Sequence, residues 1–147
     1  MKRLRLLVIE DGNEYCEFAR LYLADAFTIV EARSAAAALA ALGPGGGADV
    51  LLVDLRFDRA PVEALVGDVE ATARRLFGGD RDRALRHLQD EQGTLILAAL
   101  RAAGHGQRAV FVADLPPRRL ENLRRLYGDV HAVPSFDAAA LRQVLGG

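Results

Sequence analysis

The strongest constraint on the fold is a repeated alternation between short apolar runs and longer segments with helical spacing. Apolar runs that contain β-branched residues and end at polar or glycine residues are typical of strands covered on both faces. Helices between such strands favour a parallel sheet with right-handed crossovers. The pattern predicts an α/β fold, a flavodoxin-like doubly wound parallel sheet of five strands. The expected strands are 4–9, 27–32, 49–55, 108–115 and 129–136.

One segment, roughly residues 59 to 90, is additional to this alternation. Apolar residues spaced by three and four positions over 62–76 predict one amphipathic helix. The glycines of 78–80 end that helix, and Asp80 is placed to cap a second one. This inserted helical segment begins just after the third strand. It is either a lid or docking surface beside that strand end, or a decoration whose apolar stripe covers its own domain.

Length and composition fit a single domain spanning 1–147. The chain has 147 residues, of which 51% are hydrophobic and 27% charged, and its formal net charge is −1. This balance gives no field that would recruit nucleic acid or an anionic membrane. Cys16 is the one cysteine, which excludes an intramolecular disulfide framework and a multi-cysteine metal site. With no signal peptide and no apolar stretch long enough to span a bilayer, a cytoplasmic protein is expected.

Three acidic residues stand at the ends of two predicted strands. Glu10 and Asp11 end the first strand, and Asp54 ends the third. These strands are neighbours in a doubly wound sheet, and ligands of such sheets bind beyond the carboxyl ends of the strands. We therefore expect the three carboxylates to converge on one pocket. Carboxylates that lie close together disfavour one another's ionised form unless a cation compensates.

Two cations are available in principle to this pocket. Mg²⁺ prefers hard oxygen ligands and often bridges to a phosphoryl group, and an aspartate beside it can act as a nucleophile toward phosphorus. Alternatively, Arg56 could fold back and pair with Asp54 or Glu10 as a fixed cation. The pocket would then be neutralised without metal. The sequence leaves both interpretations open.

With these motifs in place, the sequence resembles the receiver domain of bacterial response regulators. The resemblance covers the whole chain except roughly residues 59 to 90. It rests on VIEDG at 8–12, LLVDL at 51–55, strands at 108–113 and 130–133, and a closing helix.

The resemblance implies roles for the acidic residues. Asp54 would be the phosphoacceptor, and Glu10 and Asp11 would be the acids of a Mg²⁺ pocket that the backbone carbonyl of Arg56 completes. The partners it implies are a histidine kinase or another signalling protein, and a homodimer is compatible with it. No nucleic-acid or membrane contact is expected of this domain.

The sequence departs from the family's pattern at the switch positions. Ala113 stands at or beside the place of a Ser or Thr that hydrogen-bonds the phosphoryl group, and Pro134 stands in place of a Lys. Lys2 is the only lysine of the chain, so a charge-assisted contact that is typically worth about 1.5–3 kcal/mol is missing. His131 is near the position of the family's switching aromatic residue, or is simply a half-buried strand histidine with a satisfied nitrogen. These departures indicate an atypical receiver.

Three functions follow from these observations. The first is a receiver-like domain of a two-component or phosphorelay system, with Asp54 as phosphoacceptor and an output through protein–protein contacts. The second is a pseudo-receiver that is not phosphorylated and serves as a protein-interaction module. The third is an aspartate-nucleophile phosphatase of the haloacid dehalogenase type. That family needs a second aspartate two residues after the nucleophile, where this chain has Arg56, so we expect no enzyme activity.

Overall fold

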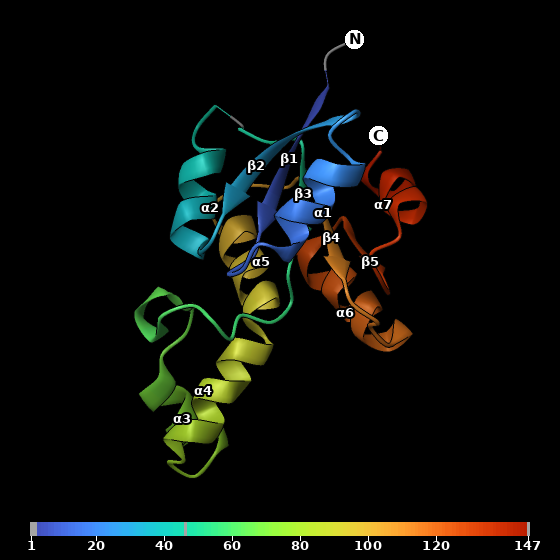
Figure 1. The fold of residues 1–147 in the computed structure, drawn as a ribbon. Helices are drawn as coiled ribbons and strands as arrows, with labels where there is room; N and C mark the ends of the chain where they lie inside the picture. Colours follow the sequence, from blue (N-terminus) through green and yellow to red (C-terminus); the bar gives the residue numbers. More distant parts are fainter. Residues whose placement is uncertain (1–2, 46, 147) are drawn as a thin grey trace.

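The computed structural model describes residues 3–45 and 47–146. Its parallel strands form one five-stranded sheet in the order β2-β1-β3-β4-β5 (Figure 1). This order confirms the predicted flavodoxin-like, doubly wound fold. The strands are β1 (Leu4–Ile9), β2 (Phe27–Ala32), β3 (Val50–Val53), β4 (Arg108–Val112) and β5 (Val130–Val133).

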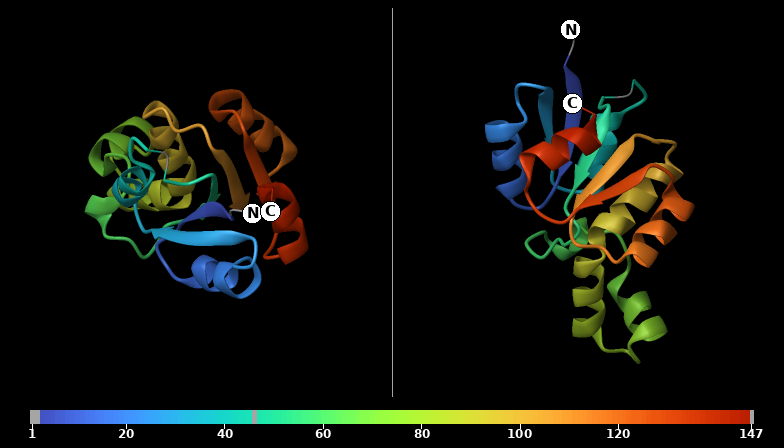
Figure 2. Two further views of the ribbon diagram at one scale, coloured as in Figure 1. Left: turned by 90° about the horizontal axis from the view of Figure 1, so that it is seen from above. Right: turned by 90° about the vertical axis from the view of Figure 1, so that its right-hand side faces the viewer.

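Helices cover both faces of the sheet (Figure 2). Side chains along a strand alternate between the two faces, and in β1 Val8 packs toward α1 and α7 whereas Leu7 packs toward α2, α5 and α6. No helix within the described ranges is long and apolar enough to cross a membrane. One face carries α1 (Glu14–Tyr22) and α7 (Ala138–Leu145); the other carries α2 (Ala35–Leu42), α5 (Gln92–Ala102) and α6 (Pro117–Tyr127).

The segment between β3 and α5 forms a helical hairpin that projects beyond the carboxyl ends of the strands (Figure 1). It contains a 3₁₀ turn, η1 (Val62–Ala64), followed by α3 (Val69–Leu76) and α4 (Arg81–Asp90). The two helices enclose a small apolar cluster of their own, separate from the two clusters that flank the sheet. Its buried members are Val69, Ala73, Ala84 and Leu88.

The prediction of one continuous helix over 62–76 is wrong. The chain turns at Gly67, whose φ of +108° is a conformation that favours glycine. A Cβ at this position would also lie 2.7 Å from a methyl group of Leu88. Asp68 then begins a new helix, since its side chain accepts a hydrogen bond from the Ala71 backbone N–H at 3.0 Å. The apolar spacing therefore continues across a break in the backbone.

A buried glutamine fixes the start of the hairpin to α5. The Gln92 side-chain oxygen accepts from Val66 N at 2.6 Å, and its nitrogen donates to Val66 O at 3.2 Å and Leu88 O at 3.1 Å. Gln92 is fully buried, so these bonds satisfy a polar group that would otherwise destabilise the core. This contact determines where the hairpin leaves the sheet.

Candidate functional site

The three acidic residues lie at the same edge of the sheet, as predicted. Ile9 and Val53 are register partners in β1 and β3, and Asp54 N donates to Ile9 O at 2.9 Å. Glu10 and Asp11 follow β1 directly, so all three residues stand where two neighbouring central strands end. What each carboxylate contacts, however, differs from the expectation.

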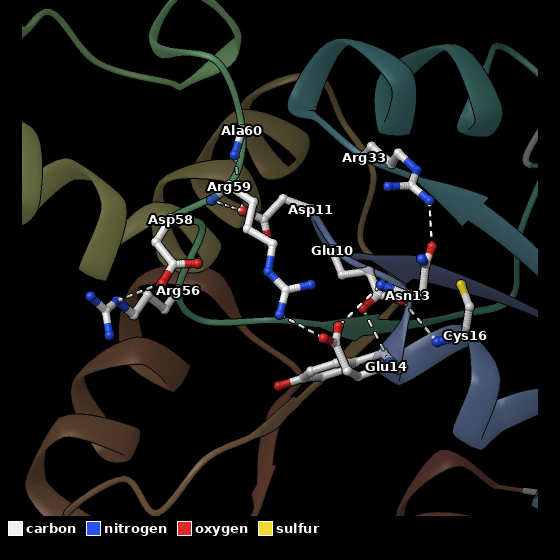
Figure 3. Close-up of polar contacts among 11 residues, drawn as sticks. Glu10, Asp11, Asn13, Glu14, Cys16, Arg33, Arg56, Asp58, Arg59 and Ala60 are labelled. Atoms are coloured by element: carbon white, nitrogen blue, oxygen red, sulfur yellow. Dashed lines mark hydrogen bonds and ion pairs between the residues drawn. The ribbon is translucent and has the colours of Figure 1, made fainter.

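Glu10 caps the first helix. Its side chain is fully buried, with Oε1 accepting from Tyr15 N at 3.1 Å and Oε2 from Cys16 N at 2.8 Å (Figure 3). The alternation of side chains in β1 puts Glu10 on the same face as Val8, toward α1. A carboxylate at a helix N-terminus satisfies free N–H groups and interacts favourably with the helix dipole.

Asp11 binds the loop that follows β3. Its Oδ2 accepts from the backbone N–H groups of Arg59 at 2.6 Å and Ala60 at 3.1 Å (Figure 3). Charge-assisted bonds of this kind are stronger than neutral ones. Asp11 therefore attaches the beginning of the 59–90 segment to the end of β1.

The three carboxylates do not gather into one group. Within residues 3–45 and 47–146, no three or more acidic, histidine or cysteine side chains are grouped so that they could hold a metal ion. Backbone N–H groups offset the charges of Glu10 and Asp11 instead. Asp54 and Asp11 are close enough for the charge of one to affect the other. Two carboxylates suit a hydrated Mg²⁺ ion, which commonly takes one or two and keeps several waters.

Arg56 does not neutralise the pocket, contrary to the alternative expectation. Its guanidinium Nε lies 3.0 Å from Asp90 Oδ1 and 3.8 Å from Asp58 Oδ2. The side chain therefore points away from Glu10 and Asp11 (Figure 3). It pairs instead with the end of α4.

Arg59 supplies a cation beside the acids. Its Nη2 lies 2.6 Å from Glu14 Oε1 in the first turn of α1. The Arg59 side chain passes directly over Gly12 and leaves no room there for a larger residue. A Cβ at Gly12 would lie 2.4 Å from Arg59 Nη1. The sequence signal for Arg59 is weak, since nothing in its spacing indicates which of the nearby arginines would turn toward α1.

The Asp54 carboxyl is partly buried and electrostatically unfavourable. Its Oδ1 accepts from Arg56 N at 3.3 Å. Burial raises the pKa of Asp54 to about 6, and the charges of Asp11 and Glu10 act in the same direction. At pH 7 and above the carboxyl is therefore predominantly ionised.

Tyr15 lies beside the candidate site, a position that the sequence alone did not indicate. Its hydroxyl donates to Val112 O, at the end of β4, at 3.3 Å. Its ring packs edge-on against that of Phe136, with the ring centroids 4.8 Å apart. Burial raises the pKa of Tyr15, and the charge of Asp54 raises it further. The available signal was its position in the first turn of a helix that begins directly after the acid pair.

The three switch positions, Ala113, His131 and Pro134, keep in the structure the departures that the sequence shows. Ala113 is partly buried and has only its backbone to offer, with its N–H donating to Val133 O at 2.9 Å. His131 Nε2 lies 2.7 Å from Asp129 Oδ1, which agrees with the interpretation as a strand histidine with a satisfied nitrogen. Pro134 follows β5 and is exposed.

Gly93 brings α5 into direct contact with the backbone of the candidate phosphoacceptor. Its N–H donates to Leu55 O at 2.8 Å. A Cβ at Gly93 would lie 2.3 Å from Asp54 O and 2.8 Å from Leu55 Cα. The backbone at Asp54 and Leu55 is therefore held by α5, which packs against it, and by β1, which is hydrogen-bonded to it.

Comparison with solved structures shows that the chain has the fold of response regulator receiver domains. The receiver domain of the Francisella response regulator 1452 is 14% identical with a TM-score of 0.61, covering 98% of this chain and 94% of that one. The chemotaxis protein CheY4 of Vibrio cholerae is 15% identical with a TM-score of 0.65, covering 99% and 98%. A response regulator receiver protein from Pseudomonas putida is 16% identical with a TM-score of 0.64, also covering 99% and 98%.

Comparison of the sequence with protein-family models and with curated proteins gives no match. The similarity to receiver structures covers nearly the whole chain, although the sequence identity is only 14–16%.

Proposed function

We propose that this chain is a receiver-like signalling domain that accepts a phosphoryl group on Asp54 and acts through protein–protein contacts. The observation that carries the proposal is the Asp54 carboxyl itself. It stands at the end of a central strand, with one oxygen held by Arg56 N at 3.3 Å and with its pKa raised by burial to about 6. The receiver fold of the chain supports the same function.

The proposed reaction needs little covalent chemistry from the protein. An Asp54 oxygen attacks the phosphorus of a donor, which is a histidine kinase phosphohistidine or a small acyl phosphate. An aspartyl O–P bond forms while the donor's N–P or O–P bond breaks, and the donor keeps the electron pair. The N–H of Arg56 and the packing of α5 hold the nucleophile in position.

Mg²⁺ is the cation that these residues fit. The carboxylates of Asp11 and Asp54, with the backbone carbonyl of Arg56, would hold it together with waters. When bound, it would neutralise charge on the carboxylates and the transferring phosphoryl group. Glu10 contributes indirectly, since it fixes the first turn of α1.

Intact mass after incubation with acetyl phosphate and Mg²⁺ tests the proposal. We expect the wild-type protein to gain one phosphoryl group and Asp54→Asn to gain none. Asp58→Asn is the matched control, because Asp58 is an exposed aspartate in the same loop, and it should behave as the wild type. Absence of an adduct on the wild type, or an adduct that survives in Asp54→Asn, would refute the role of Asp54.

One observation favours a second function, a pseudo-receiver that binds partners without being phosphorylated. Glu10 and Asp11 are already engaged by backbone N–H groups, and neither Ala113 nor Pro134 offers a side-chain donor to a phosphoryl group. Absence of an adduct together with absence of Mg²⁺ binding in calorimetry would favour this function. The protein-binding element would then be sought in the 59–90 segment.

A further inference from the structure

We propose that Tyr15 is the hydroxyl donor of the phosphoryl site, in place of the side chains missing at 113 and 134. The inference rests on the proposed function of Asp54 and adds a residue to it. The Tyr15 hydroxyl is not at the surface of α1 but at the carboxyl end of β4, where it donates to Val112 O at 3.3 Å.

The sheet register puts this hydroxyl beside Asp54. Val53 pairs with Phe111 across β3 and β4, so the next residue of each strand, Asp54 and Val112, face each other at the edge of the sheet. Val50 and Leu52 point toward α1, and the alternation along β3 directs Asp54 to the same face. The phenol therefore approaches Asp54 from the helix that covers this face. The Asp54 charge accordingly raises the pKa of Tyr15.

The Tyr15 side chain is held in this place by contacts at both ends. Its backbone N–H donates to Glu10 Oε1 at 3.1 Å, which fixes the first turn of α1. Its ring packs edge-on against Phe136 with centroids 4.8 Å apart. A donor fixed in advance of reaction loses little entropy when it binds developing charge.

A phenol hydroxyl carries one proton, so it can donate to only one acceptor at a time. In the present structure that acceptor is the neutral carbonyl of Val112 at 3.3 Å, a long bond for an O–H donor. A phosphoryl group on Asp54 would bring several negatively charged oxygens to the same edge. Because bonds to charged acceptors are stronger, the hydroxyl would exchange the carbonyl for a phosphoryl oxygen, with no proton transferred.

The test compares Tyr15→Phe with Tyr22→Phe, which removes the hydroxyl of an exposed tyrosine on the same helix. The rate of adduct formation with acetyl phosphate and Mg²⁺ is followed by intact mass. We expect Tyr15→Phe to slow phosphorylation about ten-fold, as for the loss of one hydrogen bond to a charged group, and Tyr22→Phe to leave the rate unchanged. Equal rates for both variants and the wild type would refute the role of Tyr15 while leaving that of Asp54 intact.

A second measurement does not depend on phosphorylation. The free energies of unfolding in urea of wild type, Tyr15→Phe, Asp54→Asn and the double variant form a double-mutant cycle. We expect the two substitutions to be non-additive, and the corresponding cycle with Tyr22→Phe to be additive. Additivity in the Tyr15 cycle would show that the hydroxyl lies too far from Asp54 to respond to its charge, and therefore too far to reach a phosphoryl group on it, and would overturn the proposal. An unphosphorylated wild type would overturn the proposals for both residues.

Discussion

At the scale of single residues, the Asp54 carboxyl couples folding to pH. Its pKa is raised from 3.8 to about 6, first by burial and then by the charges of Asp11 and Glu10. A raised pKa means that the folded state holds the proton more tightly than the unfolded state. Folding stability is therefore expected to fall as pH rises from about 4 to about 6 through this group, and to stay at the lower level above.

We accordingly expect Asp54→Asn to stabilise the protein at pH 7.5 in the presence of a chelator. The gain should be about 1–2 kcal/mol once solvent screening of this partly exposed group is allowed for, and it should vanish near pH 4. Urea unfolding at both pH values measures it, with the exposed Asp82→Asn as control. A stability difference that does not depend on pH would contradict the assignment.

The residues at the site show what the sequence could and could not predict. That Glu10, Asp11 and Asp54 meet at one edge followed from the strand pattern, since ends of neighbouring parallel strands coincide. Their partners did not follow, because hydrogen bonds to N–H groups of α1 and of the 59–60 loop depend on tertiary geometry. The sequence also did not show that Arg59, and not Arg56, would lie beside the acidic residues, since this too depends on tertiary geometry.

At the scale of elements, the packing of α5 against β3 is expected to be intolerant of any side chain at Gly93. In Gly93→Ala the new Cβ would lie 2.3 Å from Asp54 O, and both neighbours are backbone that must shift. We expect a loss of about 1–3 kcal/mol in stability and slower phosphorylation of Asp54, because the nucleophile moves. Urea unfolding and the mass assay measure the two effects.

Gly106→Ala is the control, since Gly106 lies in the loop after α5 and a Cβ there meets nothing within 4 Å. It should be close to wild type in stability and in phosphorylation. If Gly93→Ala were as stable and as reactive as Gly106→Ala, α5 would not determine the position of Asp54.

The helices and strands also differ in how well the sequence predicted them. Apolar runs predicted all five strands: the central strands β1, β3 and β4 are largely buried on both faces, whereas the edge strands β2 and β5 are partly exposed. The predicted ends at 55, 115 and 136 were too late, because these strands end at Val53, Val112 and Val133. The prediction for 62–76 failed because apolar spacing does not reveal the turn at Gly67, where α4 packs against the chain. The contact of Gln92 with the Val66 backbone likewise has no counterpart in a local pattern.

At the scale of the whole molecule, stability is expected to be uneven. Two large apolar clusters flank the sheet, whereas the hairpin of α3 and α4 encloses a separate small one. Regions with few buried apolar contacts open locally at a lower free energy than the core. We therefore expect the amides of α3 to exchange with deuterium faster than those of β1 and β3.

Hydrogen exchange read by mass spectrometry of peptides checks this expectation, with α5 as the internal reference. α5 is continuous with the main core through buried Ile96 and Leu97, so it should be protected like the sheet although it adjoins α4. Leu88→Ala, which removes a buried side chain of the small cluster, should accelerate exchange in α3 and leave β1 and β3 unchanged. Equal protection of α3 and β1 would show instead that the hairpin and the sheet unfold as one cooperative unit. In that case a contact on the hairpin would be coupled to Asp54 through the whole fold rather than only through residues 59 and 60, which bind Asp11.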